Sequence, residues 1–407
     1  MKCRGCGAGL HVPLIDLGTA PPSNAYLCAD QLDQAEQWVP LRVQVCDSCW
    51  LVQTEDYRSA DSLFDADYAY FSSYSSSWLE HAQRYVTQMV ERFGLNAQSR
   101  VVEIAANDGY LLQYVAQLGI PCLGVEPTAS TARAAREKGL QIREMFFGAA
   151  TAAALAAEGW CADLMAANNV LAHVPDINDF LKGFATLLQP SGVATFEFPH
   201  LLRLMVEQQF DTLYHEHYSY LSLTAVQSLC ARNGLHIFDV EELPTHGGSL
   251  RVHAQRVGGG RDASAAVAEL LAREEQAGIK TSAFYSTLAP AAERIKHELL
   301  RFLLQAKAEG KTVAAYGAAA KGNTLLNYAG VRSDLLIWVA DANPHKQGRF
   351  LPGSRIPVVA PARIAVDKPD YLLVLPWNLL DEVIQQQAGI YEWGGRFVVA
   401  VPELQVL

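Results

Sequence analysis

One stretch of the sequence decides the fold: it reads VVEIAANDG and occupies residues 101–109. Its first half is a short apolar run, which is typical of a strand buried on both faces of a parallel sheet. Its second half is a turn that ends at Gly109, after which apolar residues recur at helical spacing at Leu111, Leu112 and Val115. The stretch therefore predicts a strand, a tight turn and a helix, the repeating unit of an α/β fold.

The alternation of strand and helix continues toward the C-terminus. The candidate strands lie at residues 100–105, 122–126, 163–167, 192–197, 312–317, 335–341 and 371–375. A long helical segment at about residues 282–309 precedes the last three. Alternation of this kind predicts a doubly wound parallel sheet in the middle of the chain and a second α/β unit after it.

Two C-x-x-C pairs stand before these units, one at Cys3 and Cys6 and the other at Cys46 and Cys49. Four thiolates are the number that a closed tetrahedral zinc site needs. The separation of the pairs exceeds that of a minimal zinc ribbon, so two redox pairs or buried thiols remain the alternative. A zinc ion with four thiolate ligands has no open position, and we expect it to stabilise the fold without taking part in chemistry.

Length and composition exclude several classes of protein. At 407 residues the chain is too long for one ordinary core. The net charge of −11 and the lack of a Lys/Arg cluster disfavour nucleic-acid binding. No apolar run approaches the roughly 20 residues of a membrane span, and the first cysteine pair leaves no room for a signal peptide. The remaining cysteines are scattered singly, so we expect a cytoplasmic protein with reduced thiols and no membrane partner.

The turn after residue 103 lies where a doubly wound fold binds its ligand. Small residues let the backbone approach a ligand there, and the following helix offers free N–H groups. The next strand ends at Glu126, where a carboxylate accepts ribose hydroxyls in related folds. The sequence lacks G-x-G-x-x-G, which makes a dinucleotide site a weak interpretation.

Residues 101–109 together with GVEP at residues 124–127 resemble the first two motifs of class I S-adenosylmethionine-dependent methyltransferases. The resemblance implies that the turn faces the amino acid part of the cofactor and that Glu126 faces its ribose. Phe146 and Phe147 are candidates to stack on adenine, with ordinary core aromatics as the alternative. The cofactor-binding residues implied are Glu103, Ala105, Asn107, Gly109, Glu126, Pro127, Phe146, Phe147, Asn168 and Asn169.

The densest group of titratable residues reads YHEH at residues 214–217. Its two histidines stand only two positions apart, which matches poorly on a helix, and they lack the H-E-x-x-H spacing of a zinc site. General acid–base chemistry fits better, because a histidine titrates near neutral pH and a carboxylate can orient it. For the cluster considered alone, a hydrogen-bonded structural histidine remains the alternative.

Further motifs extend the resemblance over nearly the whole chain. The cysteine pairs and the strings LGTAPPSN (residues 17–24), YHEH, HGGSLR (246–251) and YGAAAKGNT (316–324) resemble the nucleotide-sugar C-methyltransferases. These enzymes add a methyl group to C-3′ of a nucleotide-linked 4-keto-deoxysugar. The resemblance implies a zinc-binding domain at residues 1–70, a methyltransferase domain at 71–200 and a nucleotide-sugar-binding α/β domain at 201–407.

The same resemblance assigns roles to the acid–base cluster. His217 is implied as the base, with Glu216 orienting it and Tyr214 near the keto oxygen. Tyr68 is implied to reach in from the N-terminal side and His173 to face the same pocket, with a satisfied loop histidine as the alternative for His173. The choice of His217 over its neighbour follows from the alignment of motifs, because chemistry alone leaves both open.

The C-terminal half is implied to hold the substrate. The turn after residue 316 is made of small residues and carries one lysine, which suits a diphosphate, although a tightly packed turn is the alternative. The substrate-binding residues implied are His246, Arg251, Tyr316, Lys321 and Asn323. Nothing in these motifs identifies the base, and thymidine is the commoner case in the family. We expect a monomer.

Two other functions compete with C-methylation of a nucleotide sugar. Methylation of oxygen or nitrogen on another small molecule keeps the middle domain but needs no enolising base beside a second α/β domain. A zinc ribbon with a degenerate methyltransferase domain, acting on RNA or a protein, is disfavoured by the negative charge.

Overall fold

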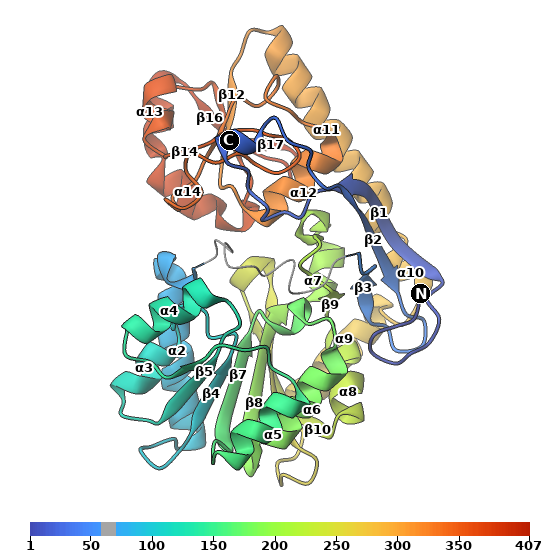
Figure 1. The fold of residues 1–407 in the computed structure, drawn as a ribbon. Helices are drawn as coiled ribbons and strands as arrows, with labels where there is room; N and C mark the ends of the chain where they lie inside the picture. The colour runs from blue at the N-terminus through green and yellow to red at the C-terminus, as the bar shows by residue number, and fades with distance from the viewer. Residues whose placement is uncertain (58–70) are drawn as a thin grey trace.

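The computed structural model describes residues 1–57 and 71–407, and Tyr68 lies outside them. The described residues form three sheets, of four, seven and six strands (Figure 1). The seven-stranded and six-stranded sheets belong to two α/β units that lie one above the other in this view, and the four-stranded sheet lies at their side. The architecture confirms the predicted α/β fold with an N-terminal strand-rich domain.

The central sheet has the strand order β10-β11-β8-β7-β4-β5-β6. Strands β4 to β8 run parallel, and β11 and β10 add an antiparallel edge. The bounds are β4 (Val101–Ile104), β5 (Cys122–Val125), β6 (Ile142–Arg143), β7 (Ala162–Asn168), β8 (Leu188–Pro199), β10 (Leu235–Leu243) and β11 (Ser249–Arg256). We placed the end of the middle domain at residue 200, and the two edge strands of this sheet lie beyond that position.

Helices cover both faces of the central sheet. One face packs against α2 (Ser76–Phe93), α3 (Leu112–Gln117) and α4 (Ala129–Glu137). The other packs against α5 (Ala149–Ala157), α6 (Ile177–Leu187), α8 (Leu223–Arg232) and α9 (Ala265–Ala277). Alternate residues of β4 belong to the two cores, with Val101 in one and Val102 in the other. Burial on both faces explains the continuous apolar run that marks this strand in the sequence.

The C-terminal sheet repeats this pattern with the order β14-β13-β12-β15-β16-β17, in which only β17 is antiparallel. Its strands are β12 (Val313–Tyr316), β13 (Val339–Ala340), β14 (Val358–Val359), β15 (Tyr371–Val374), β16 (Arg396–Val399) and β17 (Gln405–Val406). The helices of this unit are α12 (Ala320–Ala329), α13 (Arg363–Asp367) and α14 (Leu380–Gln386). In both α/β sheets the next two strands are added on one side of the first strand, β4 or β12, and the later strands are added on its other side. This change of side creates a crevice at the carboxyl ends of the strands.

The N-terminal region contacts both α/β units. Its strands β1 (Val12–Ala20), β2 (Val39–Val45) and β3 (Val52–Thr54) form an antiparallel meander, and β9 (Ser219–Tyr220) pairs with β3. The meander shares a core with α10 (Ser282–Tyr285), the long α11 (Leu288–Ala308) and one face of the C-terminal sheet. The four cysteines, two before β1 and two between β2 and β3, pack instead against the core of the central sheet.

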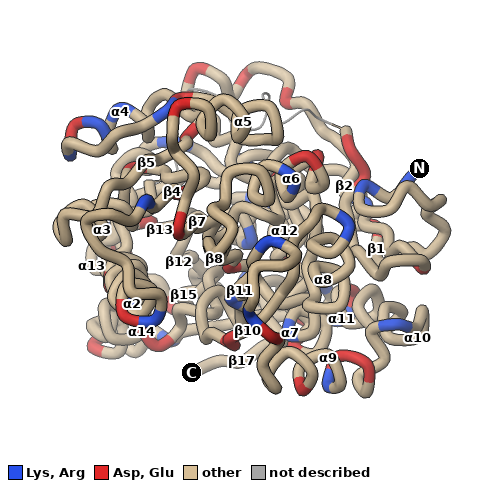
Figure 2. Tube along the Cα trace, turned by 90° about the horizontal axis from the view of Figure 1, so that it is seen from below, with Lys and Arg blue, Asp and Glu red and all other residues tan. Residues whose placement is uncertain are grey.

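Short segments complete the chain. They are α7 (Leu201–Val206) and the 3-10 turns Ala29–Gln31, Ser72–Tyr74, Leu171–His173, Phe210–Thr212, Thr245–Gly247, Trp377–Leu379 and Ala388–Trp393. Figure 2 shows both signs of charge interspersed along the helices and loops. Among the described helices, none combines the length and the apolar character needed to cross a membrane.

The turn after β4 tolerates no side chain at Gly109. Its φ is +77°, and a Cβ atom there would lie 2.2 Å from Cδ1 of Leu140. Gly119 has a similar φ of +69° but has open space around it. Gly109 therefore carries both a conformational and a packing requirement, whereas Gly119 carries only the first.

We expect Gly109→Ala to lower the free energy of unfolding by about 2–4 kcal/mol, because strain and overpacking add. Gly119→Ala should cost about 1 kcal/mol, from strain alone. Urea unfolding followed by fluorescence measures both. Equal losses in the two variants would contradict the packing argument.

Candidate active site

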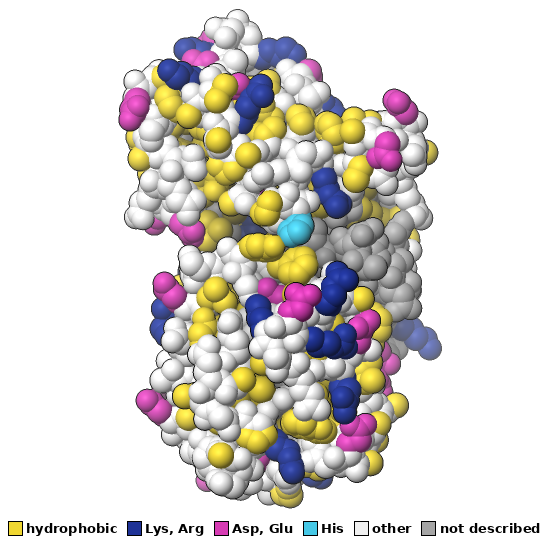
Figure 3. Space-filling model, turned by 60° about the vertical axis from the view of Figure 1, so that its left-hand side comes forward, with side chains coloured by type: hydrophobic (Ala, Val, Ile, Leu, Met, Phe, Trp, Pro, Cys, Tyr) yellow, Lys and Arg dark blue, Asp and Glu magenta, His cyan; other side chains and the backbone are white. Residues whose placement is uncertain are grey.

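A cavity of about 770 Å³ lies between the carboxyl ends of the central and C-terminal sheets. On the surface, Figure 3 shows a groove between the two lobes in which hydrophobic side chains and a histidine gather. One side of the cavity is formed by residues that follow β4, β5 and β7, and the other by residues that follow β12 and β15. The crevices at the two switch points therefore open into the same space.

Glu126, which we predicted to face the ribose, lines the cavity and is only 4% exposed. Its two oxygens accept the backbone N–H groups of Asn107 and Thr128, both at 2.9 Å. Burial raises the pKa of Glu126, and these two hydrogen bonds oppose that rise. Carboxylate oxygens retain further acceptor sites, so ribose hydroxyls can donate to them.

Two adjacent amides point to an absent polar ligand. The side chain of Asn168 is buried and lines the cavity, yet neither its nitrogen nor its oxygen has a hydrogen-bond partner among the described residues. The side-chain oxygen of Asn169 is unpaired in the same way. A buried amide without a partner costs about 1–3 kcal/mol, which a bound ligand would recover. The amides therefore fit the amino acid part of S-adenosylmethionine.

The other predicted cofactor residues divide into two groups. Ala105, Asn107 and Pro127 line the cavity, as do both phenylalanines. Phe146 is half exposed and available for stacking, whereas Phe147 packs edge-on against two core phenylalanines. Within the described part of the chain, Glu103 and Gly109 do not belong to the lining. Gly109 lies in the turn itself and Glu103 in β4, where burial raises the pKa of Glu103 well above its usual value.

The histidine predicted as the base has a defined tautomer. Nδ1 of His217 donates to the carbonyl oxygen of Thr212 at 3.1 Å, which leaves Nε2 as the acceptor for the hydroxyl of Tyr214 at 2.7 Å. Burial lowers the pKa of His217 well below its usual value, and the neighbouring His173 lowers it further. The imidazole is therefore neutral near pH 7 and can accept a proton at Nε2.

His173 and the tyrosine complete the cluster at the cavity wall. The ring of His173 meets that of His217 edge-on, with centroids 4.6 Å apart. Nδ1 of His173 donates to the backbone carbonyl oxygen of Glu216 at 2.8 Å, and burial lowers the pKa of His173 to about 4. His173, Tyr214 and His217 all line the cavity, so the structure brings these three predicted residues together.

The carboxylate of Glu216 has a different partner from the one we predicted. It accepts hydrogen bonds from the backbone and side-chain nitrogens of Asn24, both at 3.2 Å. Orientation of His217 comes instead from Thr212 and Tyr214. His215 contacts the carbonyl oxygens of residues 39 and 40 with Nε2. In residues 1–57 and 71–407, the lining of the cavity includes neither Glu216 nor His215.

Two lysines face the cavity from the C-terminal unit. The ammonium of Lys321 donates to Asn378 at 2.6 Å and lies 4.4 Å from the centre of the Trp377 ring. Burial lowers the pKa of Lys321, and the charge of Asp211 opposes that shift. The ammonium of Lys346 donates to the carbonyl oxygen of Ala318 at 2.7 Å. Lys346 also lies 3.8 Å from a carboxylate oxygen of Asp341, and the lining on this side of the cavity includes both cationic side chains.

Of the five predicted substrate-binding residues, His246 and Lys321 line the cavity. The other three contact protein groups. Asn323 donates to the carbonyl oxygen of Ser23 at 2.6 Å, and the hydroxyl of Tyr316 donates to Gln386 at 3.2 Å. Arg251 is buried and pairs with Glu197 at 2.9 Å. These contacts stabilise the walls of the cavity.

Sequence reasoning missed several residues that line the cavity. Asn24 lies in the string LGTAPPSN, which served only for the resemblance, and Trp78 lies in the first turn of α2. Lys346 and Asn378 follow strands of the C-terminal sheet. Their positions after buried strands were a signal that could have identified them.

The four N-terminal cysteines form a separate metal site. Their sulfur atoms lie within 4.8 Å of one another, and two pairs are 3.5 Å apart. Tetrahedral zinc with Zn–S bonds of about 2.3 Å requires sulfur separations of about 3.8 Å. Gln53 also donates to the sulfur of Cys3, at 3.3 Å. The site therefore fits zinc, and a zinc ion held by the four thiolates would have no open coordination position.

Comparison with protein families identifies three regions. A zinc binding domain matches residues 3–64, a methyltransferase domain matches 78–240, and a C-methyltransferase C-terminal domain matches 244–402. The chain is 36% identical over 406 residues to C-methyltransferase NovU of Streptomyces niveus, covering all of this chain and 96% of the relative.

Other similarities are confined to part of the chain. A ubiquinone biosynthesis O-methyltransferase of Chelativorans sp. (strain BNC1) is 33% identical over 98 residues, which are 23% of this chain and 38% of the relative. Among solved structures, magnesium protoporphyrin IX methyltransferase from Synechocystis PCC 6803 with bound SAH is 19% identical, with a TM-score of 0.35. That match covers 44% of this chain and 83% of the other.

Loss of one zinc ligand tests the metal site. We expect Cys6→Ser to reduce bound zinc from about one ion per chain to none and to lower the melting temperature, because structural zinc contributes folding free energy. Cys28→Ser, at an exposed cysteine outside the cluster, is the matched control and should retain the metal. Atomic emission and thermal unfolding measure the two effects. Full stability of metal-free Cys6→Ser would refute a structural role.

Proposed function

The chain belongs to the family of S-adenosylmethionine-dependent C-methyltransferases, and we propose that its acceptor is a nucleotide-linked 4-keto-deoxysugar methylated at C-3′. One observation carries this proposal. A neutral histidine, His217, and a tyrosine hydroxyl line a cavity that has amides for the cofactor at one side and lysines at the other. Carbon methylation beside a ketone needs a base and an oxygen-stabilising donor, and this pair supplies both.

His217 and Tyr214 divide the proton chemistry between them. Nε2 of His217 removes the proton from C-3′, and the electron pair of that C–H bond moves to form an enolate with charge on the C-4′ oxygen. Nδ1–H remains bonded to the Thr212 carbonyl, which stabilises the imidazolium that forms. The hydroxyl of Tyr214 is positioned to donate to the enolate oxygen when the substrate displaces it from His217.

The methyl donor is held by the other side of the cavity. Glu126 binds the ribose, Phe146 stacks on adenine, and Asn168 and Asn169 bind the amino acid part, following the proposed assignment of these residues. S-adenosylmethionine, when bound, would supply an electrophilic methyl group: its bond to sulfur breaks as the bond to the enolate carbon forms, which leaves S-adenosylhomocysteine. The acceptor carbon must lie close both to Nε2 of His217 and to the methyl group of the cofactor, so we place the acceptor ring between His217 and the two asparagines.

Charge on the C-terminal unit supports a diphosphate in the acceptor. Lys321 and Lys346 line the cavity beside the first turn of α12, where Ala320 also belongs to the lining. Backbone N–H groups in the first turn of a helix have no intrahelical partner and attract anions. Two ammonium groups and a helix start suit a nucleoside diphosphate better than a neutral acceptor, and we propose a thymidine nucleotide as in most of the family.

Isotope-labelled methyl transfer tests the substrate. The enzyme is incubated with trideuteromethyl S-adenosylmethionine and thymidine- or guanosine-linked 4-keto-6-deoxy and 4-keto-2,6-dideoxy hexoses, and the products are analysed by mass spectrometry. We expect one labelled methyl group on carbon and loss of one ring proton. Transfer to none of the four sugars by enzyme that binds the cofactor would refute the proposed acceptor and favour a small-molecule O- or N-methyltransferase.

Substitution of the base separates catalysis from cofactor binding. We expect His217→Asn to lower kcat by about 10³-fold or more while calorimetry shows unchanged affinity for S-adenosylmethionine. His215→Asn is the matched control, because His215 contacts backbone carbonyls away from the cavity, and it should retain most activity. A loss confined to His215→Asn would exchange the roles of the two histidines.

The pH dependence follows from the low pKa of His217. The base acts in its neutral form, so activity falls on the acid side as pH drops through the pKa of the free enzyme. Because burial lowers that pKa well below about 6.5, kcat/KM should stay constant from about pH 8 to below pH 6.5. An acid limb centred above pH 6.5 would contradict a neutral buried base.

A further inference from the structure

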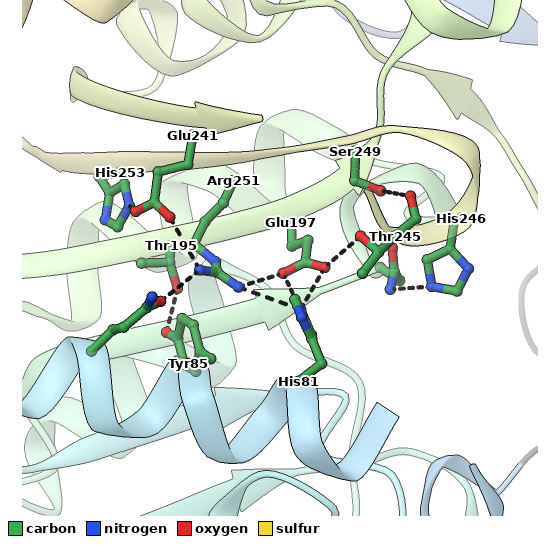
Figure 4. A network of polar contacts seen from close by, with 12 residues as sticks. His81, Tyr85, Thr195, Glu197, Glu241, Thr245, His246, Ser249, Arg251 and His253 are labelled. Atoms are coloured by element: carbon green, nitrogen blue, oxygen red, sulfur yellow. Dashed lines mark hydrogen bonds and ion pairs between the residues drawn. The ribbon is translucent and has the colours of Figure 1, made fainter. Parts of the chain in front are cut away.

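A buried ion pair lies behind the cavity and is not used by the chemistry described above. Glu197 of β8 and Arg251 of β11 are 0% and 2% exposed, and their charged groups are 2.9 Å apart (Figure 4). His81 of α2 also contacts the carboxylate, at 2.9 Å from both oxygens. Burial alone would raise the pKa of Glu197, but the hydrogen bond from His81 and the charge of Arg251 lower it. The carboxylate is therefore ionised.

Stability alone does not account for this pair. Removing two charges from water costs several kcal/mol per ion, and a hydrophobic pair of similar volume is often as stable or more stable. A buried ion pair is better explained by a role in holding neighbouring groups in one conformation out of several. The groups that contact Glu197 show which geometry that is.

The first connection runs through Thr245 to His246. The hydroxyl of Thr245 donates to Glu197 at 3.2 Å, and the carbonyl oxygen of Thr245 accepts from the hydroxyl of Ser249 and the N–H of Gly248, both at 2.9 Å. His246 follows with φ 54° and ψ 24°, a left-handed conformation that costs a residue with a side chain about 1–3 kcal/mol. The contacts around Thr245 maintain this strained backbone.

The second connection runs through Asn169. Its backbone N–H donates to the carbonyl oxygen of Glu197 at 2.7 Å, and its side-chain nitrogen donates to Nε2 of His246 at 3.1 Å. Nε2 of His246 is therefore the acceptor, and the ring proton resides on Nδ1. Burial lowers the pKa of His246 to about 4, so the ring stays neutral with this tautomer near pH 7.

The third connection is aromatic. The ring of His81 stacks on Trp78 with centroids 4.8 Å apart, and Trp78 contacts the ring of His246 at 5.2 Å. Trp78, Asn169 and His246 all line the cavity. Three separate paths thus lead from Glu197 to His246 and its neighbours. Figure 4 shows the contacts of Glu197 with Thr245 and with His81.

We propose that Glu197 is a positioning residue, whose carboxylate, held by Arg251 and His81, sets the orientation of the His246 ring at the wall between cofactor and acceptor. Thr245 and, through His81, Trp78 transmit the effect of the carboxylate, while Asn169 bonds the backbone carbonyl oxygen of Glu197 and Nε2 of His246. The inference rests on the proposed function only through the acceptor needed for kinetic assays.

A double-mutant cycle tests whether Glu197 acts through His246. We expect Glu197→Gln and His246→Ala each to lower kcat/KM by about tenfold to a hundredfold, since misplacement of one group costs this much. The double variant should be no slower than His246→Ala alone. Multiplication of the two single effects would overturn the proposal, because Glu197 would then act independently of His246.

A gentler substitution guards against misfolding of the charge variant. Thr245→Val removes only the hydroxyl bonded to Glu197, and we expect a loss of kcat/KM that Thr245→Ser restores. Thr195→Val is the matched control, because Thr195 is buried on β8, the strand that carries Glu197. Its hydroxyl bonds the hydroxyl of Tyr85 at 2.6 Å, away from His246. The control substitution should lower the melting temperature and leave kcat/KM unchanged. Equal kinetic losses in Thr245→Val and Thr195→Val would indicate a merely structural network.

A spectroscopic measurement needs no acceptor and therefore separates this proposal from the identity of the substrate. In protein labelled with ¹⁵N-histidine, the ring nitrogens report which one carries the proton. We expect Glu197→Gln and Thr245→Val to shift the signals of His246 while those of His217 stay in place. Unchanged His246 signals in both folded variants would overturn the proposal even if the sugar acceptor is confirmed, and shifted signals would support it even if that acceptor fails.

Discussion

The cavity depends on one constraint: the N-terminal region contacts both α/β units and keeps the carboxyl ends of their sheets face to face. Its cysteines pack on the core of the central sheet, and its strands share a core with α11 and the C-terminal sheet. Asn24 bonds Glu216, and the hydroxyl of Tyr26 donates to the carbonyl oxygen of Ala318. Zinc held by these cysteines would stabilise the segment that joins the two halves of the site.

Burial then determines what the histidines can do. His173, His217 and His246 all have pKa values below the usual range, mainly because the cavity wall excludes water from them. Each ring is neutral, and its tautomer is defined by a protein partner: Nδ1 of His173 and of His217 bonds a backbone carbonyl oxygen, and Nε2 of His246 accepts from Asn169. A carboxylate beside the base would have raised its pKa, and in this molecule Glu216 is bonded elsewhere. The three histidines are therefore neutral near pH 7 because they are buried in the wall of the cavity.

The fold was largely predictable from the sequence, whereas the partners of individual site residues were not. Buried strands such as residues 101–104 reveal themselves because both faces need apolar side chains. The edge strands β10 and β11 belong to the central sheet although they lie beyond the boundary at residue 200. The sequence pattern of a strand does not show which strand it pairs with, so the pairing of β11 with β8 and of β10 with β11 was not predictable. Glu216 stands next to His217 in the chain, but it lies in a turn rather than a strand, and its carboxylate accepts hydrogen bonds from Asn24.

By itself, the sequence determined the α/β class, the four zinc ligands and the small-residue turn at which the cofactor is expected, because each depends on residues that are close in the chain or chemically unmistakable. Only the tertiary structure decided that Tyr214, His173 and Lys321 share one cavity, that Arg251 lies behind it, and that Glu197 reaches His246. These residues are far apart in the sequence: His173 and Lys321 are 321 − 173 = 148 positions apart, and Thr245 and Glu197 are 48 apart. Their geometry arises from the packing of one sheet against another, which no local pattern encodes.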